Sequence, residues 1–206
     1  MAHCIFATLQ KEVKAKILSK RILSHIWSEF AQYTVEYIRR DGRVEHQIRE
    51  MHDTGDGAAI LLYDLRYQKI VLIKQYRLAA MINEKSDGIL YEVCAGLVEN
   101  NDPKATIIKE VKEETGFLIE EPLYLFSAFA TPGAKTEKIH FFTAKVDLDQ
   151  TIEGGGGMEA EQEDIEVVIM PFDEAWEKLK EGSIRDLKTI TLLLHARMEI
   201  FAQSST

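Results

Sequence analysis

Cysteine and proline are scarce in this chain, which has two cysteines and four prolines among 206 residues. The thiols of Cys4 and Cys94 cannot form a disulfide framework, so the class of small disulfide-stabilised secreted domains is excluded. No apolar run reaches the length that spans a membrane, and the N-terminal residues lack the apolar core of a signal peptide. We therefore expect a cytoplasmic protein that does not act at a membrane.

Basic residues are outnumbered as well, with 25 Lys and Arg against 34 Asp and Glu and a formal net charge of -9. A protein that binds nucleic acid through its phosphates needs a basic surface, so we expect no nucleic-acid partner. Gathered carboxylates are instead compatible with metal binding. The length allows one domain, or one domain with an extension, that buries a substantial core.

One stretch, residues 95–117, organises the rest of the chain. Asp102 and Pro103 predict the start of a helix, because Asp accepts hydrogen bonds from free N–H groups and Pro is favoured at the first helical position. Gly116 predicts its end, since glycine adopts the left-handed conformation at low cost. The predicted helix runs over about residues 103–115.

Three glutamates on this predicted helix, Glu110, Glu113 and Glu114, have the spacing i, i+3, i+4 and share one face. Like charges at this spacing repel, and no Lys or Arg lies between them on that arc. Carboxylates completed by water and phosphate oxygens suit Mg²⁺. A solvated acidic face is the alternative, but the glycine-bounded loop and helix favour a metal site.

The same stretch resembles the signature of the Nudix hydrolases, G-x5-E-x7-R-E-U-x-E-E-x-G-U, in which U is a bulky apolar residue. The C-terminal half of the signature is complete from Glu110 to Phe117, and Gly96 matches the first glycine. Asp102 replaces the first Glu and Lys109 replaces the Arg. The spacer between them is one residue shorter than in the signature.

Further segments resemble one branch of this family, the nucleoside-diphosphate-sugar pyrophosphatases, and most of all their GDP-mannose type. The resemblance covers about residues 23–194. It implies an α/β fold, an α/β/α sandwich with a mixed sheet, and a homodimer in which N-terminal strands help to build the partner's substrate pocket. The segments that carry it are residues 47–50, 75–77, 127–137, 154–159 and 182–186.

Two parts of the chain are expected. Residues 1–52 would form an extension with antiparallel strands that serves dimerisation, and residues 53–206 would form the Nudix domain. Asp41 and Gly42 predict a hairpin between strands at 33–38 and 44–51. Residues 1–20 look like a partly helical lead-in.

Within the second part, apolar runs predict strands, and capping signals predict two late helices. Residues 79–88 and 149–163 look like loops. Asp173 is expected to cap a helix over residues 174–181, and residues 185–201 form the last helix. The predicted strands cover residues 57–63, 69–77, 90–95, 123–130, 138–146 and 165–170.

The resemblance also implies a ligand set. It places Mg²⁺, which Mn²⁺ can replace, on Glu110, Glu114 and the backbone carbonyl of Ala95. Glu113 either joins a second metal ion or holds the metal shell by hydrogen bonds, so the catalytic role of this glutamate stays open.

An acidic run after the four glycines at 154–157 supplies a further candidate. Glu163 corresponds to a late glutamate of the family and is predicted as a metal ligand and general base, with Glu113 or Glu161 as alternatives. We expect residues 153–162 to be mobile without substrate and to become ordered on binding. A solvated surface loop is the other interpretation of this run.

Arg77 is the predicted clamp for the diphosphate, since a guanidinium grips phosphate with two hydrogen bonds. Each basic candidate could instead be a surface ion-pair residue, and the aromatic candidate could be a core residue. The other candidates for contacts with the base, the sugar and the phosphates of a nucleotide sugar are Trp27, Arg49, Glu50, Gly96, Glu137 and Lys188.

Three functions remain open from the sequence. The first is Mg²⁺-dependent hydrolysis of a nucleoside-diphosphate sugar to a nucleoside monophosphate and a sugar phosphate. The second is hydrolysis of ADP-ribose by the same chemistry. The third is a nucleotide sensor with this fold and no catalysis, which the three intact glutamates disfavour.

Overall fold

The computed structural model describes residues 14–150, 154–158 and 164–202. The chain forms two compact units. Unit 1 comprises Met1–Thr54 and Thr131–Thr136, and unit 2 comprises Gly55–Ala130 and Glu137–Thr206.

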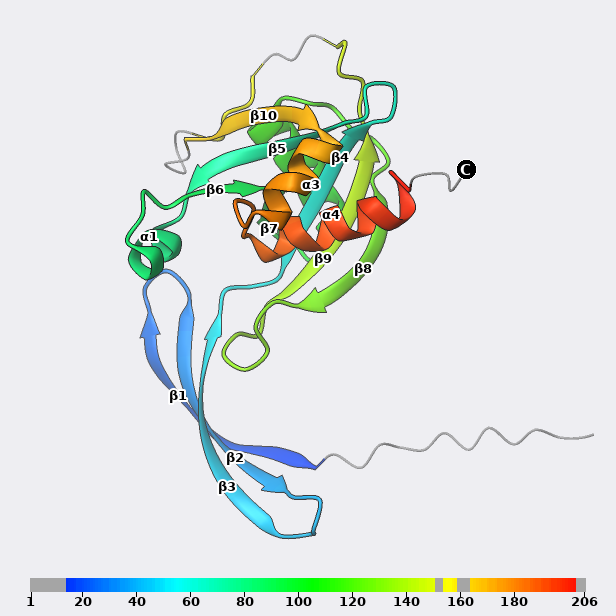
Figure 1. Cartoon of the computed structure of the whole chain (residues 1–206). Coiled ribbons are helices and arrows are strands. Elements are labelled where there is room, and N and C mark those ends of the chain that lie inside the picture. The colour runs from blue at the N-terminus through cyan, green and yellow to red at the C-terminus, as the bar shows by residue number, and fades with distance from the viewer. Residues whose placement is uncertain (1–13, 151–153, 159–163, 203–206) are drawn as a thin grey trace, which may run out of the picture. The chain divides into compact units, whose positions relative to one another are not determined.

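Unit 1 is built on a three-stranded antiparallel sheet in the order β1-β2-β3 (Figure 1). Its strands are β1 (Ala15–His25), β2 (Glu29–Ile38) and β3 (Val44–Asp53). The predicted hairpin at Asp41 and Gly42 is confirmed, with Gly42 at φ 82°. The helical lead-in is wrong from Ala15 onward, because these residues pair with β2 and tertiary pairing overrides local propensity.

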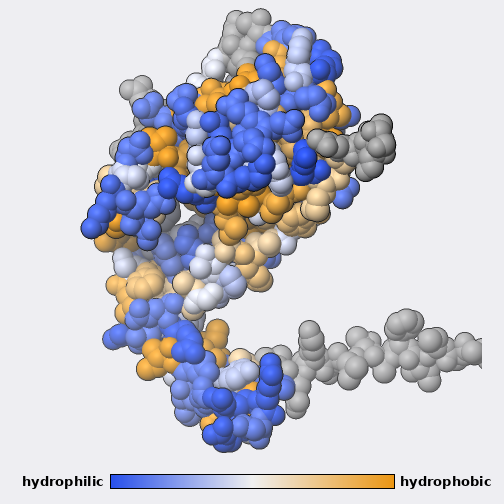
Figure 2. Space-filling view, viewed as in Figure 1, coloured by the Kyte–Doolittle hydropathy of each residue, from blue (hydrophilic) through white to orange (hydrophobic). Residues whose placement is uncertain are grey.

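The sheet of unit 1 has little core of its own. Among its described residues, Ala31 is the only buried hydrophobic residue. Ile22 and Ile48 are more than half exposed, and apolar residues are scattered over the surface of the strands (Figure 2). A sheet of this kind gains stability only when another surface covers it.

Unit 2 holds a mixed seven-stranded sheet with the path β10-β5-β4-β9-β8, to which β6 adds beside β5 and β7 beside β4. Strands β4 and β9 are parallel, and the other pairs are antiparallel. The strands are β4 (Gly57–Asp64), β5 (Lys69–Tyr76), β6 (Ile89–Glu92), β7 (Cys94–Leu97), β8 (Leu123–Phe129), β9 (Lys138–Lys145) and β10 (Glu166–Pro171).

Helices cover both faces of this sheet. Alternation along β4 sends Ala59 and Leu61 to the core under α3 (Phe172–Lys180) and α4 (Leu187–Glu199), which cross one face in Figure 1. It sends Ile60 and Leu62 to a second core with Ile107 of α2 (Pro103–Glu110). The predicted α/β/α sandwich with a mixed sheet is therefore confirmed.

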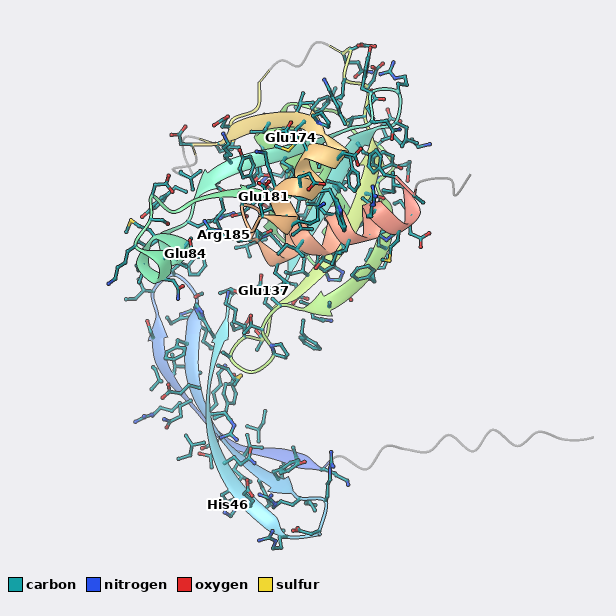
Figure 3. All side chains as sticks on the ribbon, in the orientation of Figure 1. His46, Glu84, Glu137, Glu174, Glu181 and Arg185 are labelled. Atoms are coloured by element: carbon teal, nitrogen blue, oxygen red, sulfur yellow. The ribbon has the colours of Figure 1, made fainter. Side chains whose placement is uncertain are left out.

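Helix ends and a predicted loop needed correction. Residues 79–88 are not all loop, because α1 (Leu78–Glu84) forms there and ends at left-handed Lys85. Its last residue, Glu84, is paired with Arg185, with Oε2 and Nη1 2.5 Å apart (Figure 3). Asp173 does not cap α3, which begins one residue earlier, but lies in its first turn, where a carboxylate suits the helix dipole.

The predicted strand over residues 90–95 is two strands. β6 pairs with β5 and β7 pairs with β4, so the chain changes partner at Val93. At this point the Val93 N–H donates to a side chain, Thr189 Oγ1 at 2.8 Å, and not to a neighbouring strand. None of the described helices is long and apolar enough to cross a membrane.

Candidate active site

The site is built where β7 meets the end of α2. The backbone N–H of Ala95 donates to Glu114 Oε2, 3.1 Å away. Glu114 was expected at the surface, facing a metal ion, but its residue surface is only 1% exposed. A buried carboxylate needs hydrogen bonds or a positive partner, and Ala95 supplies one such bond.

Glu110 lies against the next residue of β7. A Cβ added to Gly96 would be 2.3 Å from both Cδ and Oε1 of Glu110. Only glycine leaves room for the carboxylate at this position. The structure thus brings Gly96, Glu110, Ala95 and Glu114 together, and the family resemblance implied such a grouping.

The last turn of the predicted helix is wider than an α-helix. Residues Val111–Thr115 form a π-helical turn, and Thr115 Oγ1 donates to the Val111 carbonyl. Single π turns occur often at functional sites because they change the direction of the side chains that follow. This turn carries Glu113 and Glu114.

Glu113 has a cationic partner on its own helix. Lys109 Nζ lies 3.4 Å from Glu113 Oε2 and 3.0 Å from Glu99 Oε1. The hydrogen bond to Glu99, with the charge of Glu113, raises the pKa of Lys109 above its usual value. The expectation that no cation accompanies the glutamates is therefore wrong for Glu113. The described residues contain no group of three acidic, His or Cys side chains placed to hold a metal ion.

The glycine run closes the end of the π turn. The N–H groups of Gly156 and Gly157 donate to the carbonyls of Glu114 and Glu113, over 2.9 and 3.2 Å. All four glycines have positive φ, and a Cβ on Gly155 would be 2.9 Å from the carbonyl carbon of Thr115. These glycines, predicted as part of a loop, therefore also cap the end of a helix.

The donor set fits a hard divalent cation. Two carboxylates converge on the Ala95 and Gly96 backbone, in a cradle that a side chain at Gly96 would fill. Mg²⁺ uses one or two protein carboxylates and completes its octahedron with water and substrate phosphate oxygens. A third carboxylate was expected from Glu163, which lies outside the described residues.

A second charged cluster lies beside this site and includes two predicted substrate contacts. Arg77 Nε and Nη2 donate to the two oxygens of Glu92, over 2.7 and 2.9 Å. Lys188 Nζ lies 3.3 Å from Glu92 Oε2 and 2.7 Å from Asp186 Oδ1. Asp186 also caps α4 through the Thr189 N–H. Arg77, the predicted diphosphate clamp, and Lys188, a predicted nucleotide or sugar contact, are therefore already held by carboxylates.

Burial and charge compete at Glu92. Burial acts to raise its pKa, but the hydrogen bond from Arg77 and the charge of Lys188 outweigh it and leave the pKa lowered. For Lys188, burial lowers the pKa, and the charges of Glu92 and Asp186 more than reverse this and leave it raised. Both groups are thus held in their charged forms.

Sequence reasoning missed Glu92, Asp186 and Thr189. One signal was available for Glu92, since it is a lone charge in an apolar run, and such a charge is buried only when it is paired. Thr189 is fully buried and gave no signal, because its partner Val93 is 96 positions away in the sequence.

The remaining predicted contacts fall in different places. Glu137 precedes β9, and its Oε1 would be 3.6 Å from a Cβ on Gly57, at the start of β4 (Figure 3). Trp27, Arg49 and Glu50 belong to unit 1. Trp27 is 76% exposed and tilted against His52, with 6.2 Å between ring centroids, so the alternative that Trp27 is a core residue is wrong.

The loop over residues 153–162 was predicted to be mobile. The structure describes residues 154–158 of it, and residues 153 and 159–162 lie outside the described residues.

Comparisons with known families match two parts of the chain. The family model described as "NUDIX domain" matches residues 53–193. The family model described as "GDP-mannose pyrophosphatase NudK N-terminal domain" matches residues 14–52.

Curated relatives are similar over most of the chain. A Cronobacter sakazakii protein named GDP-mannose pyrophosphatase is 40% identical over 186 residues, which are 90% of this chain and 96% of the relative. A protein of the same name from Escherichia coli O157:H7 is 42% identical over 182 residues, 88% of this chain and 94% of the relative.

A solved structure described as an ADP compounds hydrolase has a TM-score of 0.71 and covers 94% of this chain and 97% of its own. Its sequence identity is 15%, so this likeness is one of fold.

Proposed function

The chain belongs to the Nudix hydrolase family, and we propose that it hydrolyses the pyrophosphate bond of a nucleoside-diphosphate sugar of the GDP-mannose type. The products are a nucleoside monophosphate and a sugar phosphate. The observation that carries the proposal is the convergence of Glu110 and Glu114 on Ala95 and Gly96. The names of the relatives and the length over which they match support the choice of substrate class.

Glu110, Glu114 and the Ala95 carbonyl would hold the metal ion, for which Mg²⁺ is proposed and Mn²⁺ is a substitute. When bound, the ion neutralises the phosphate oxygens and lowers the pKa of the attacking water. The chain's own residues hold this geometry, because Gly96 leaves room for Glu110 and the Ala95 N–H fixes Glu114. Glu163 is proposed as general base, with Glu113 and Glu161 as alternatives.

The other contacts are assigned by chemistry. Arg77 and Lys188 are proposed to bind the diphosphate, since both are cations near the glutamates and Arg77 is close enough to Glu114 for electrostatic attraction. Glu137 is proposed to accept hydrogen bonds from sugar hydroxyls, and the Gly96 backbone to approach the phosphate. In unit 1, Trp27, Arg49 and Glu50 are proposed to contact the nucleotide bound by a partner subunit.

A homodimer is part of this proposal. The sheet of unit 1 leaves Ile17, Ile22, Ile48 and Val44 more than half exposed, and a second copy of the chain would cover such a surface. We propose that residues 1–52 serve this association and that residues 53–206 form the catalytic domain. The cytoplasmic location expected from the sequence stays a prediction.

Hydrolysis of ADP-ribose is the second candidate function. It is favoured by the fold that this chain shares with an ADP compounds hydrolase. The chemistry at the phosphates is the same, and the difference lies in the base and the sugar. The sensor hypothesis has no comparable support.

A substrate panel tests the proposal. Release of mononucleotide from GDP-mannose and from ADP-ribose is measured with Mg²⁺, with excess chelator, and after Mg²⁺ or Mn²⁺ is restored. We expect GDP-mannose to have the higher kcat/KM, chelator to abolish turnover, and either ion to restore it. Full turnover in excess chelator would contradict the metal assignment, and a preference for ADP-ribose would select the second candidate.

One variant ties the activity to the site. Glu114→Gln is expected to lower kcat by about a hundredfold or more while the chain stays folded, since the Gln side chain can still accept from the Ala95 N–H. Melting the variant separates loss of chemistry from loss of fold.

A further inference from the structure

Two cations of unit 2 share one buried carboxylate. Glu92 is 1% exposed and binds Arg77 through both of its oxygens and Lys188 through Oε2. Arg77 follows β5 and Lys188 lies in the first turn of α4, so Glu92 joins two elements that are far apart in the sequence. Without this carboxylate the two cations would repel each other.

The contact also fixes how each cation is presented. Glu92 binds the Nε and Nη2 edge of the guanidinium, and in the described part of the chain Nη1 has no hydrogen-bond partner. The Arg77 side chain is 41% exposed and that of Lys188 is 22% exposed, although both end on a buried partner. Each cation is therefore anchored on a buried carboxylate while part of its side chain stays accessible to solvent.

The same cluster is tied to the segment that receives Glu110 and Glu114. Asp186 Oδ2 accepts from the N–H and Oγ1 of Thr189, over 2.9 and 2.7 Å. Thr189 Oγ1 accepts in turn from the Val93 N–H, two residues before Ala95. One chain of hydrogen bonds thus joins the start of α4 to the strand that carries the proposed metal site.

We propose that Glu92 is a positioning residue, which orients Arg77 and Lys188 toward the diphosphate of the substrate. This inference rests on the proposed function, because it takes these two cations as the groups that meet the phosphates. In this proposal Glu92 acts through Arg77 and Lys188, the two cations that it binds. A guanidinium that is already held in one orientation loses less conformational freedom when it binds phosphate. Fixing its orientation therefore increases the affinity for the substrate.

Electrostatics alone predicts the opposite result, which makes the inference testable. The cluster holds two cations and two carboxylates, Arg77 and Lys188 with Glu92 and Asp186. Removing the Glu92 charge makes the cluster more positive, and a more positive site attracts an anionic substrate more strongly. If Glu92 acts by orienting the cations, its loss weakens substrate binding in spite of the added positive charge.

The experiment compares Glu92→Gln, Glu92→Asp and a matched control. Glu92→Gln removes the charge, and Glu92→Asp keeps the charge but withdraws it by one methylene. Glu166→Gln is the control, because Glu166 also pairs with a lysine of β5, Lys74, but at an exposed position. Values of kcat and KM for GDP-mannose are measured with saturating Mg²⁺, at a temperature where melting curves show each variant folded.

We expect KM to rise about tenfold or more in both Glu92 variants while kcat falls less than about threefold, and the control to match the original chain. The dissociation constant of GDP-mannose, measured by calorimetry in a Glu114→Gln background, should rise by the same factor. In an Arg77→Ala background, Glu92→Gln should raise KM by a smaller factor, because only Lys188 remains for Glu92 to orient.

Three results would overturn the inference: an unchanged or lower KM in Glu92→Gln, a KM fully restored by Glu92→Asp, or an equal effect of Glu92→Gln with and without Arg77. If Glu92→Gln does not fold, Glu92→Asp decides the matter. Failure of the original chain to hydrolyse GDP-mannose or ADP-ribose would overturn the proposed function and this inference with it. Normal turnover by the original chain, together with an unchanged KM in the Glu92 variants, overturns only the inference about Glu92.

Discussion

The carboxylate of Glu110 occupies the space that a side chain on Gly96 would fill, since a Cβ there would be 2.3 Å from Cδ and Oε1 of Glu110. The two residues come from β7 and α2, which meet only in the folded chain. Gly96 is therefore required by a side chain 14 positions later in the sequence. This contact decides where one of the two proposed metal-binding carboxylates can lie.

The first prediction concerns this contact. Gly96→Ala should lower kcat by about a hundredfold, because the new methyl group displaces the Glu110 carboxylate by an ångström or more. The atoms displaced are the end of a flexible side chain, so the free energy of unfolding should change by less than about 1 kcal/mol. Gly133→Ala is the control, because nothing lies within 4 Å of a Cβ there. A Gly96→Ala enzyme with normal kcat would contradict the site geometry.

The second prediction concerns the hydrogen bond between Thr189 and Val93. Thr189→Val should reduce the free energy of unfolding by about 1–3 kcal/mol, because it leaves the buried Val93 N–H without its acceptor. It should also lower kcat, since the backbone before Ala95 loses a support. Thr191→Val on the same helix removes an exposed hydroxyl that bonds only to the Leu187 carbonyl, and should stay within about 0.5 kcal/mol of the original chain. Equal stability of the two variants in urea would count against this role.

The third prediction compares two neighbouring glycines. Gly154→Ala and Gly155→Ala both place a side chain at positive φ, which costs roughly 1–3 kcal/mol. Gly155→Ala should lose about 1–3 kcal/mol more, because its Cβ meets the Thr115 backbone while that of Gly154 meets nothing within 4 Å. Denaturant unfolding of both variants measures the difference. If they unfold at the same denaturant concentration, the contact of the glycine run with the π turn is not formed in solution.

The fourth prediction is a pH dependence that belongs to Glu92. Its folded-state pKa is lowered, so its contribution to stability is fully present above the unfolded value of about 4.3 and is lost as pH falls through the lower folded value. Lys188 has a raised pKa, so its contribution is complete below about pH 10.4 and is lost only at higher pH. The stability difference between the original chain and Glu92→Gln should therefore be constant from about pH 5 to pH 10 and shrink in acid.

Urea unfolding at several pH values measures this difference. Glu166→Gln serves again as control, because the Glu166 side chain is 64% exposed and solvent screens its pair with Lys74. A difference that grows as the pH falls below 4.3 would show that the Glu92 pKa is raised in the folded chain.

The fifth prediction concerns assembly. The chain should be a dimer by light scattering at micromolar concentration, because the apolar residues of unit 1 have little core of their own in the described part of the chain. Ile48→Glu, on exposed β3, should shift the equilibrium toward monomer, whereas Leu118→Glu, at an exposed position of unit 2, should not. A monomeric original chain would contradict the proposed dimer.

Several features of the fold followed from local pattern. The helix from Pro103 and its end at Gly116 were predicted within the observed limits, because capping residues act on the nearest turn. The strands β4, β5 and β9 were predicted from apolar runs that reflect burial on both faces of a sheet. Where local pattern was ambiguous, as over residues 15–20 and at Val93, pairing with a distant strand or helix decided the outcome.

Residue types at fixed short spacings were enough to show the resemblance to the family and to single out Glu110, Glu113 and Glu114, and the sandwich fold followed from that resemblance. Tertiary structure alone decided that Glu110 and Glu114 converge on β7 while Glu113 pairs with Lys109. It also decided that Arg77 and Lys188 share the buried Glu92. The physical reason is distance along the chain: these contacts join residues that no helical or strand period relates, and packing of the sheet against its helices brings them together.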